Sequence, residues 1–333
     1  MKQVLAALGA VALVAAALAV RGLIEGDDGG GGDATVVCPP ELAEACQAMG
    51  GGTTVVVQPA AETADSLVAA TSAGQAGADV WLVPAPWVEW VRDERAEGGA
   101  DELVGEPTDP VARSPVTLVV WDDRAAALEA GECQGGVTWR CLGDAADRPW
   151  ADVGGEASWG RLKVGLVDPG SATGMIVLGG ATAGFFDSPD YASNDFGGQL
   201  TGWLGALGAD AAAAGSGDPV ARMVTRGPGE FSAVGALEVT AREAAGRDDL
   251  RVLYPAPVAT ADLVAVPIGD AGSADDIAGD GDLRRALAEA GWRVEGEPAA
   301  EGVAEDQALP DDDGLPGGGV LRALVARWDE ATR

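Results

Sequence analysis

The chain has no histidine among its 333 residues. This absence excludes the Ser-His-Asp and Cys-His nucleophile arrangements, and it removes a side chain on which most transition-metal sites depend. General acid–base chemistry would fall to carboxylates, to a lysine or to the two tyrosines. The sequence shows no carboxylate pair placed for such chemistry, so we expect neither an enzyme nor a bound metal or cofactor.

Basic residues are scarce as well. The chain has 21 Lys and Arg against 53 Asp and Glu, which gives a formal net charge of −32. Binding to nucleic acid needs clustered Lys and Arg to neutralise phosphates, and docking on anionic lipid needs a basic patch. This acidic composition therefore argues against a nucleic-acid partner and favours a soluble protein of the cell envelope or of a salty habitat.

The four cysteines form two local pairs, Cys38 with Cys46 and Cys133 with Cys141, each with seven intervening residues. An even number in two short loops predicts two disulfides in an oxidising compartment. Two alternatives stay open: reduced cysteines in the core, and zinc, whose ligands more often stand two to four residues apart.

The N-terminal stretch predicts export. An apolar run from Val4 to Val20 is followed by Arg21 and a Gly/Asp-rich stretch from Glu25 to Asp33. The run is long for the core of a signal peptide and short for a full membrane span. A cleaved signal peptide and a retained membrane anchor both remain open, and residues 1–33 are set aside from the fold. In either case we expect a location in the cell envelope, outside the cytoplasm.

After this stretch, strands and helices alternate along the chain, and the strands are continuous apolar runs. This pattern is typical of an α/β protein with a mainly parallel sheet flanked by helices. A longer extended run over 110–121 contains two prolines and is expected to cross between domains. We expect strands at 35–38, 53–57, 79–83, 231–237, 250–254 and 261–268, and helices at 41–49, 63–72, 87–95, 283–290 and 320–328, with Thr63 capping the second helix. The regions 197–217 and 296–318 give no clear signal.

The most informative segment runs from Ser158 to Phe186. It predicts a short strand, a tight turn and a helix that opens with Ser171, Thr173 and Gly174. A strand that leads into a helix N-terminus leaves backbone N–H groups free to bind a ligand. The two hydroxyl residues are equally typical of ordinary helix caps, so both roles stay open.

Several blocks of sequence resemble one known family. They are Val36-Val-Cys-Pro-Pro40, Ala78-Asp-Val-Trp-Leu-Val-Pro-Ala-Pro-Trp87, 111–120, 159–174, 231–238, 252–255 and 261–267. Together they are similar to extracellular substrate-binding domain proteins of actinobacteria with the type II periplasmic-binding fold, and more distantly to molybdate- and sulfate-binding proteins.

The resemblance implies two α/β domains joined by two hinge strands. Residues 34–112 and 263–333 would form the first domain, and residues 113–262 would form the second. A ligand would lie in the cleft between the domains, as is usual beyond the carboxyl ends of strands in open α/β sheets. Closure on the ligand would be a hinge motion.

The resemblance also implies where a ligand would be contacted. First-domain contacts would fall near Cys38–Glu41, in the stretch from Ala61 to Ser66, and in the loop from Pro84 to Trp87. We therefore take as candidate ligand-binding residues Thr63, Ser66, Pro84, Trp87, Ser171, Thr173 and Gly174. In oxyanion binders of this kind a serine stands where this chain has Cys38-Pro39-Pro40, and the prolines have no N–H to donate. Molybdate or sulfate is therefore in doubt.

Other residues have a possible ligand role beside an ordinary structural one. Trp87 and Trp90 would form an aromatic wall or belong to the core. Arg113 and Arg226 would neutralise an anion or pair with acidic surface groups. The run Asp311–Asp313 lacks the spaced oxygen ligands of a calcium loop and is expected to be a solvated loop.

Two functions follow from the resemblance. The first is an exported, monomeric protein that captures a small molecule or anion and hands it to a membrane permease of an ABC transporter. The second is a membrane-tethered binding or sensory module that acts on an envelope protein partner without transport. A retained apolar segment would suit the second function.

Titration of thiols tests the predicted disulfides. The exported protein, denatured without a reductant, should show no free thiol, because each cysteine is paired within its own loop. Four free thiols would contradict the pairing and leave reduced or zinc-bound cysteines as the alternatives.

Overall fold

A computed structural model describes residues 34–210, 217–270 and 274–333. The predicted signal peptide or anchor at 1–33 lies outside these residues. Ala34–Arg333 forms one compact unit. Across the described ranges, none of the helices combines the length and apolar character needed to cross a membrane.

The first sheet has the strand order β2-β1-β3-β8-β4. β1 pairs in parallel with β2 and β3, and β8 runs antiparallel to β3. We call this sheet and its helices the first lobe. Its strands are β1 (Ala34–Cys38), β2 (Thr53–Val57), β3 (Val80–Pro84) and β8 (Thr260–Pro267), and its helices are η1 (Pro40–Leu42), α2 (Ala43–Gln47), α3 (Ala60–Ala69), α4 (Ala73–Ala76), α5 (Ala85–Glu97), α13 (Ala274–Ala278) and α14 (Gly281–Ala290).

The second sheet is built on the far part of β4 (Ala112–Trp121) and is mixed rather than mainly parallel. β6 and β7 both run antiparallel to β4, whereas β5 pairs in parallel with β6. We call this sheet and its helices the second lobe. Its other strands are β5 (Val164–Leu166), β6 (Ala233–Leu237) and β7 (Leu250–Leu253), and its helices are α6 (Asp122–Ala130), α7 (Trp139–Ala145), η2 (Trp150–Asp152), η3 (Ala157–Trp159), α8 (Gly174–Phe186), η4 (Ser193–Asp195), α9 (Gly198–Leu207), α11 (Pro219–Arg226) and α12 (Glu238–Ala245).

Two strands connect the lobes. Ala112–Pro115 of β4 pair antiparallel with residues 260–263 of β8, and β4 then continues into the second sheet. The extended run predicted at 110–121 is therefore confirmed as the strand that leaves the first sheet. The domain limits at 112/113 and 262/263 fall on these two strands and stay a prediction.

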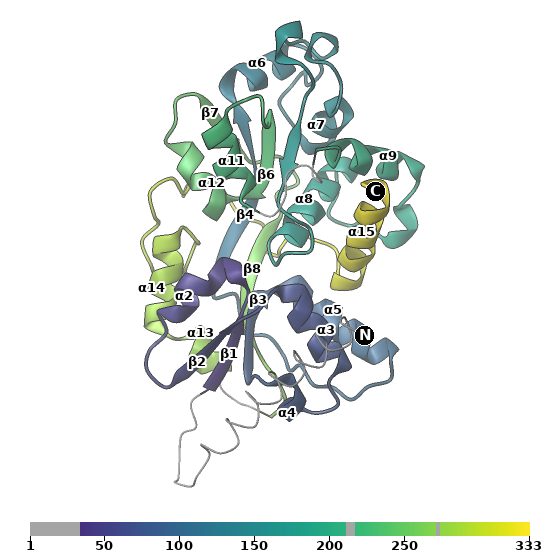
Figure 1. Ribbon diagram of the computed structural model, residues 1–333. Coiled ribbons are helices and arrows are strands. Elements are labelled where there is room, and N and C mark those ends of the chain that lie inside the picture. The colour runs from purple at the N-terminus through teal and green to yellow at the C-terminus, as the bar shows by residue number, and fades with distance from the viewer. Residues whose placement is uncertain (1–33, 211–216, 271–273) are drawn as a thin grey trace, which may run out of the picture. The chain divides into compact units, whose positions relative to one another are not determined.

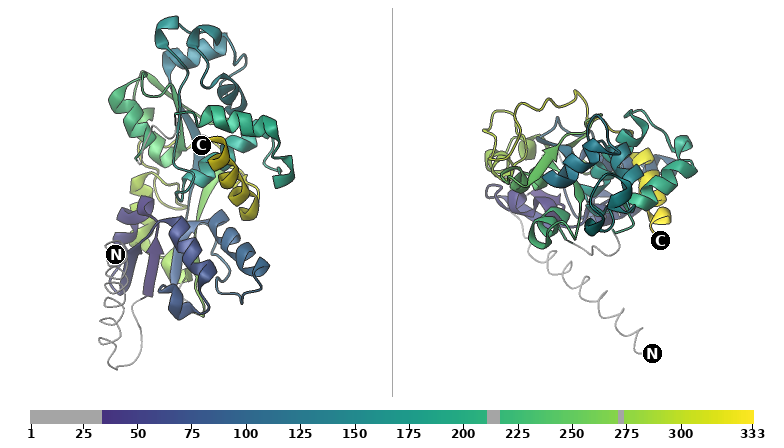
Figure 2. Two further views of the ribbon diagram at one scale, coloured as in Figure 1. Left: turned by 45° about the vertical axis from the view of Figure 1, so that its right-hand side comes forward. Right: turned by 90° about the horizontal axis from the view of Figure 1, so that it is seen from above.

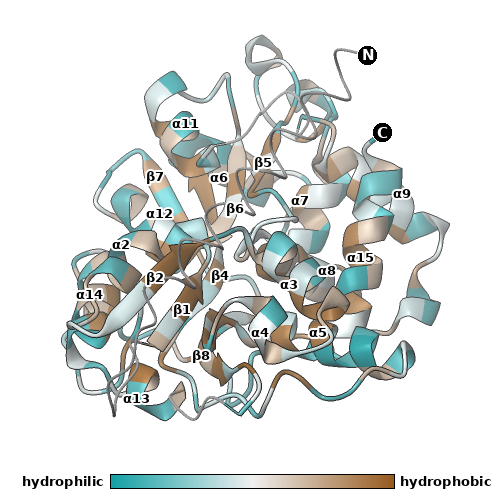
Figure 3. Ribbon diagram, turned by 60° about the horizontal axis from the view of Figure 1, so that its bottom comes forward, coloured by the Kyte–Doolittle hydropathy of each residue, from teal (hydrophilic) through white to brown (hydrophobic). Residues whose placement is uncertain are grey.

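Hydrophobic burial explains why the sheets form where they do. β3 and β6 are buried along their whole length, so residues on both of their faces are covered. On β6, Ala233 and Leu237 join the larger core, whereas Val234 and Ala236 join a smaller one with Met223. In Figure 3 the strands β1 and β8 are largely hydrophobic, and α11 shows hydrophilic residues. Such continuous apolar strands need cover on both faces.

Several predicted helix limits are wrong. α3 begins at Ala60 with Pro59 at its N-cap, so Thr63 lies inside the helix and does not cap it. α5 begins two residues before Trp87. The helix expected at 41–49 is divided into η1 and α2. In each case a proline stands at the true start, where its fixed φ and missing N–H suit the first turn of a helix.

The helix α15 (Gly318–Ala331) contacts both lobes. It packs against α5 of the first lobe and against α8 and α9 of the second. The left view of Figure 2 shows it, in yellow, lying against helices of both lobes. A Cβ at Gly318 would collide with Pro86 O, so only glycine allows this close approach to α5. Glu89 Oε2 also accepts a hydrogen bond of 2.9 Å from Gly318 N.

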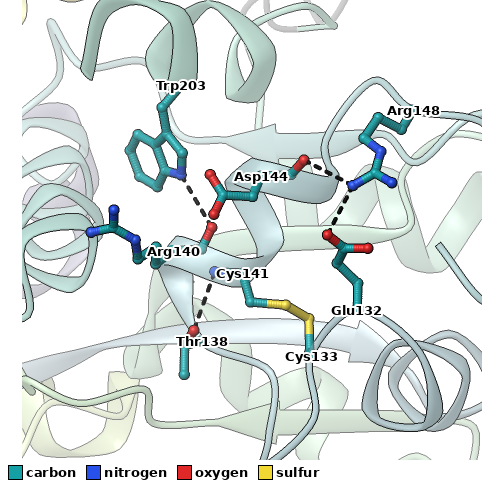
Figure 4. Close-up of a disulfide and its surroundings, with 8 residues drawn as sticks. All are labelled: Glu132, Cys133, Thr138, Arg140, Cys141, Asp144, Arg148 and Trp203. Carbon is teal, nitrogen blue, oxygen red and sulfur yellow. Dashed lines mark hydrogen bonds and ion pairs between the residues drawn. A yellow bond between two sulfur atoms is a disulfide. The ribbon is translucent and has the colours of Figure 1, made fainter. Parts of the chain in front are cut away.

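The second disulfide, Cys133–Cys141, is confirmed and fastens the start of α7 to the loop before it. Its Cα atoms are 5.6 Å apart. Thr138 caps α7 by accepting a hydrogen bond of 3.2 Å from Cys141 N, and Arg148 pairs with Glu132 at 3.0 Å beside the bridge. Figure 4 shows these groups around the two sulfurs. The short loop is therefore held by a covalent bond, a cap and an ion pair.

Residues 292–317, which we call the strap, run along the connection between the lobes and are fastened by two arginines. The Arg113 guanidinium bonds Asp262 at 2.8 Å and donates to Pro310 O and Asp312 O at 2.9 and 2.7 Å. Arg293, within the strap, pairs at 2.8 Å with Glu238, whose side chain is 1% exposed. A buried carboxylate is stable only when paired and hydrogen-bonded, so this pair fixes the strap to the start of α12.

Asp313 is a partly buried residue of the strap. Burial, opposed by the hydrogen bond from Leu315 N and assisted by the nearby carboxylates of Asp262 and Glu89, raises the pKa of its carboxyl to about 6. The unfolded chain has the ordinary value of 3.8. The native state therefore holds this proton more tightly, and the contribution of Asp313 to the free energy of unfolding falls as pH rises from about 4 to about 6.

This shift predicts the behaviour of Asp313→Asn. The amide keeps the acceptor for Leu315 N and removes the buried charge, so the variant should gain stability over wild type at about pH 7.5 and little at about pH 4. Urea unfolding at both pH values measures the difference. The control is Asp311→Asn, because Asp311 is exposed on the same loop. Equal gains for Asp313→Asn at both pH values would contradict the shifted pKa.

Candidate ligand-binding site between the lobes

The turn that precedes α8 is the second-lobe part of the candidate site. β5 ends at Leu166, and the turn from Asp168 to Thr173 leads into the helix. Ser171 Oγ accepts from Gly174 N at 3.0 Å and donates to Asp168 O at 2.8 Å. A Cβ at Gly174 would collide with Asp168 O, so a tight turn requires glycine there. The predicted strand, turn and helix are confirmed.

The hydroxyl of Ser171 is thus used to hold the first turn of α8. Thr173 stands at the N-cap, and its side chain makes no capping hydrogen bond. Both residues are partly exposed, whereas Ala172 between them is buried. The direct contact of Ser171 or Thr173 with a ligand stays a prediction.

Ala172 is where the two lobes meet. Its N–H donates to Glu41 Oε1 at 3.1 Å, and its carbonyl accepts from Trp87 Nε1 at 3.0 Å. Both acceptor and donor come from the first lobe, from η1 and α5. The two lobes are therefore joined, through side chains on one side and main chain on the other, at the start of α8.

The first disulfide, Cys38–Cys46, is confirmed and holds the loop that carries Glu41. Its Cα atoms are 6.7 Å apart, and both cysteines are buried. Cys38 O also accepts from Gln58 N at 2.9 Å, which ties the end of β1 to the residue after β2. Pro39 and Pro40 have no N–H, so this wall of the site offers the carboxylate of Glu41 instead of donors.

Pro84 and Trp87 lie where β3 passes into α5. Pro84 is the last residue of β3 and the N-cap of α5. Trp87 is 1% exposed, and its ring lies 4.8 Å from that of Trp90, centroid to centroid. Trp87 is thus a core residue that also contacts the opposite lobe, and its direct contact with a ligand stays a prediction.

Thr63 and Ser66 lie within α3. The hydroxyl of Thr63 donates to Pro59 O at 3.2 Å, and that of Ser66 donates to Glu62 O at 2.8 Å. Both bonds return to the helix's own carbonyls. Thr63 is buried and Ser66 exposed, and a ligand role for either stays a prediction.

The two candidate arginines are engaged elsewhere. Arg113 holds the strap, as described above, and Arg226 pairs with Glu230 at 3.3 Å. The strap borders a cavity of about 330 Å³ that Arg113 and Arg293 line together with Glu295, Glu297 and Glu305. Because both guanidiniums already pair with Asp262 and Glu238, this cavity offers no free positive charge from them.

Comparisons with known proteins identify the fold. No protein-family model matches the chain, and no curated protein matches it in sequence. Solved structures do match. The periplasmic binding protein P5PA is 14% identical with a TM-score of 0.56, and the match covers 90% of this chain and 99% of that one. The ferric binding protein from Campylobacter jejuni is 10% identical with a TM-score of 0.54 and the same coverage.

A third match is FutA2 from Synechocystis PCC6803, which is 14% identical with a TM-score of 0.53 over 91% of this chain and 97% of that one. These likenesses show that the chain has the α/β fold of type II periplasmic binding proteins, with a mixed sheet. The fold predicted from the sequence is confirmed.

Sequence reasoning placed one wall of the site near Cys38–Glu41 but did not single out Glu41. The signal was weak, because one exposed glutamate among 53 acidic residues has no distinguishing pattern. Its position directly after Pro39-Pro40, inside a predicted disulfide loop, was the available clue.

Replacing Trp87 tests the contact between the lobes. Trp87→Phe removes the indole N–H and leaves the carbonyl of Ala172 buried without its partner, which should lower the free energy of unfolding by about 1–3 kcal/mol. Chemical unfolding measures the loss. Trp90→Phe is the control, since Trp90 is only partly buried in the same helix. Similar losses for the two variants would mean that packing, and not the hydrogen bond to Ala172, is what Trp87 contributes.

Proposed function

We propose that the chain is a solute-binding protein that captures a small molecule between its lobes and presents it to a membrane transporter of the ABC type. The observation that carries this proposal is the meeting of the lobes at the N-terminus of α8, where Glu41 and Trp87 contact Ala172. Two lobes that close on each other through a few polar contacts have the arrangement needed to enclose a ligand by hinge motion.

Three further observations support it. The fold is shared with periplasmic binding proteins over nine-tenths of the chain. The two disulfides fit an oxidising compartment outside the cytoplasm. The function needs no chemical step, which agrees with a chain that has no histidine.

For ligand contact we propose the turn residues Ser171, Thr173 and Gly174 on the second lobe and Pro84 and Trp87 on the first. The iron that gives one of the similar proteins its name is not carried over to this chain. Among residues 34–210, 217–270 and 274–333, no group of three or more Cys, Asp or Glu is placed to hold a metal ion.

Thermal unfolding in the presence of candidate solutes tests the proposal. The panel contains inorganic oxyanions, amino acids, sugars and polyamines. A true ligand at a hundred times its dissociation constant should add about 2.7 kcal/mol to the free energy of unfolding. The double variant Ser171→Ala, Thr173→Ala should lose this gain if the two side chains touch the ligand, whereas a uniform loss of stability with the gain intact would mean that they only support α8.

Thr201→Ala is the matched control. Its hydroxyl donates to Gly197 O within α9, so the variant loses a similar bond elsewhere in the second lobe. It should keep the full gain from the ligand. If no compound of the panel stabilises wild type, capture of these solutes is ruled out, and binding to an envelope protein partner becomes the better account of the fold.

A further inference from the structure

The N-terminus of α8 already holds an anion, and that anion belongs to the chain. The carboxylate of Glu41 accepts from the N–H of Ala172, the residue before the N-cap of α8. The first turn of a helix has unpaired N–H groups and a partial positive charge, which attract a negative group. Glu41 therefore occupies the position in which a negatively charged solute would bind.

Other donors of the turn are also taken by the chain itself. Gly174 N donates to Ser171 Oγ at 3.0 Å, and Gly170 N donates to Asp168 Oδ1 at 3.0 Å. The turn is thus bordered by a second carboxylate, that of Asp168, which is exposed. An approaching anion would meet two negative charges and few free donors.

The first lobe presents Glu41 on a braced loop. The disulfide Cys38–Cys46 closes this loop, and Pro40 starts the short helix η1 on which Glu41 lies. A side chain on a loop fixed at both ends loses little conformational entropy when it forms its bond, so the contact with Ala172 is pre-organised. Trp87 holds the carbonyl of the same residue and keeps Ala172 in place.

We infer that Glu41 determines the specificity of the cleft by excluding anionic solutes from the N-terminus of α8. This inference rests on the proposed function and narrows it: the solutes that the lobes accept carry no net negative charge. An inorganic oxyanion could bind only by displacing a carboxylate that is covalently part of the protein. The chemical reason is that the first lobe presents an acceptor, the carboxylate of Glu41, where an anion would need hydrogen-bond donors.

The first experiment measures the contact itself, without any ligand. Exchange of the Ala172 amide hydrogen with solvent deuterium, followed by NMR, should be slow in wild type. In Glu41→Ala it should be at least tenfold faster, because the amide loses its acceptor. Glu41→Gln should lie between the two, since a carboxamide oxygen accepts more weakly than a carboxylate. Unchanged exchange in Glu41→Ala would overturn the inference whatever the protein binds.

The second experiment uses sodium sulfate as the probe in titration calorimetry of the full chain. Wild type should show no detectable binding, and Glu41→Ala should bind sulfate at least tenfold more tightly than wild type. Sulfate should also restore slow exchange at Ala172 in Glu41→Ala alone. The control is Glu44→Ala, which removes an exposed carboxylate from the same disulfide loop and should behave as wild type.

The outcomes separate this inference from the proposed function. If wild type is stabilised by a neutral or cationic solute but Glu41→Ala gains no affinity for sulfate, capture of solutes stands and the role of Glu41 is wrong. If wild type itself binds sulfate as tightly as Glu41→Ala, the role of Glu41 is wrong as well. If neither wild type nor Glu41→Ala binds any compound, both proposals fail together.

Discussion

The antiparallel pairing of β4 with β8 is the constraint on which both lobes depend. Ala112–Pro115 pair with residues 260–263, after which β4 extends the second sheet while β8 extends the first. One short ladder therefore sets the relative direction of two sheets. The ion pair between Arg113 and Asp262 crosses this ladder at 2.8 Å, and the same guanidinium reaches carbonyls of the strap. Any motion of the lobes must bend this pair of strands or turn about them.

The many carboxylates of the chain have a common structural use. Asp218 and Asp280 cap α11 and α14 from their own N-caps. Glu89 accepts from the first residue of α15, and Glu41 accepts from the turn before α8. A carboxylate at a helix N-terminus is favoured by the partial charge of the helix. The acidic composition thus does more than keep the protein soluble: in α8 and α15 it joins elements that are distant along the chain.

Much of the fold was predictable because its signals are local. Thr53–Val57 is a run of β-branched residues, and the strand formed there with those limits. The segment from β5 to α8 has an apolar strand, a glycine that the turn requires, and a long apolar helix. The paired cysteines lie within single loops, so their spacing was sufficient.

The features that the sequence did not reveal depend on weak local preferences or on contacts between residues far apart in the sequence. α9 begins with glycine and contains two more glycines, so its helix depends on tertiary packing, which overrides weak intrinsic preference. α12 follows directly on β6, and its first residue, Glu238, pairs with Arg293, 55 positions further along. Glu41 and Ala172 are separated by 131 positions. Contacts of this length leave no periodic trace, because nothing in the residues between them depends on the pairing.

The return of the chain to the first sheet, in β8, also limits the order in which the two lobes can fold. β8 pairs with β3 across some of the longest separations in the molecule, and α15, which contacts both lobes, comes later still. During synthesis, which proceeds from the N-terminus, the first sheet must wait without its strand β8 while the whole second lobe emerges. Such long-range pairing slows folding and leaves the open edge of β3 exposed in the meantime. The second lobe can therefore form its own core before the first lobe has all of its strands, although the first lobe is begun earlier.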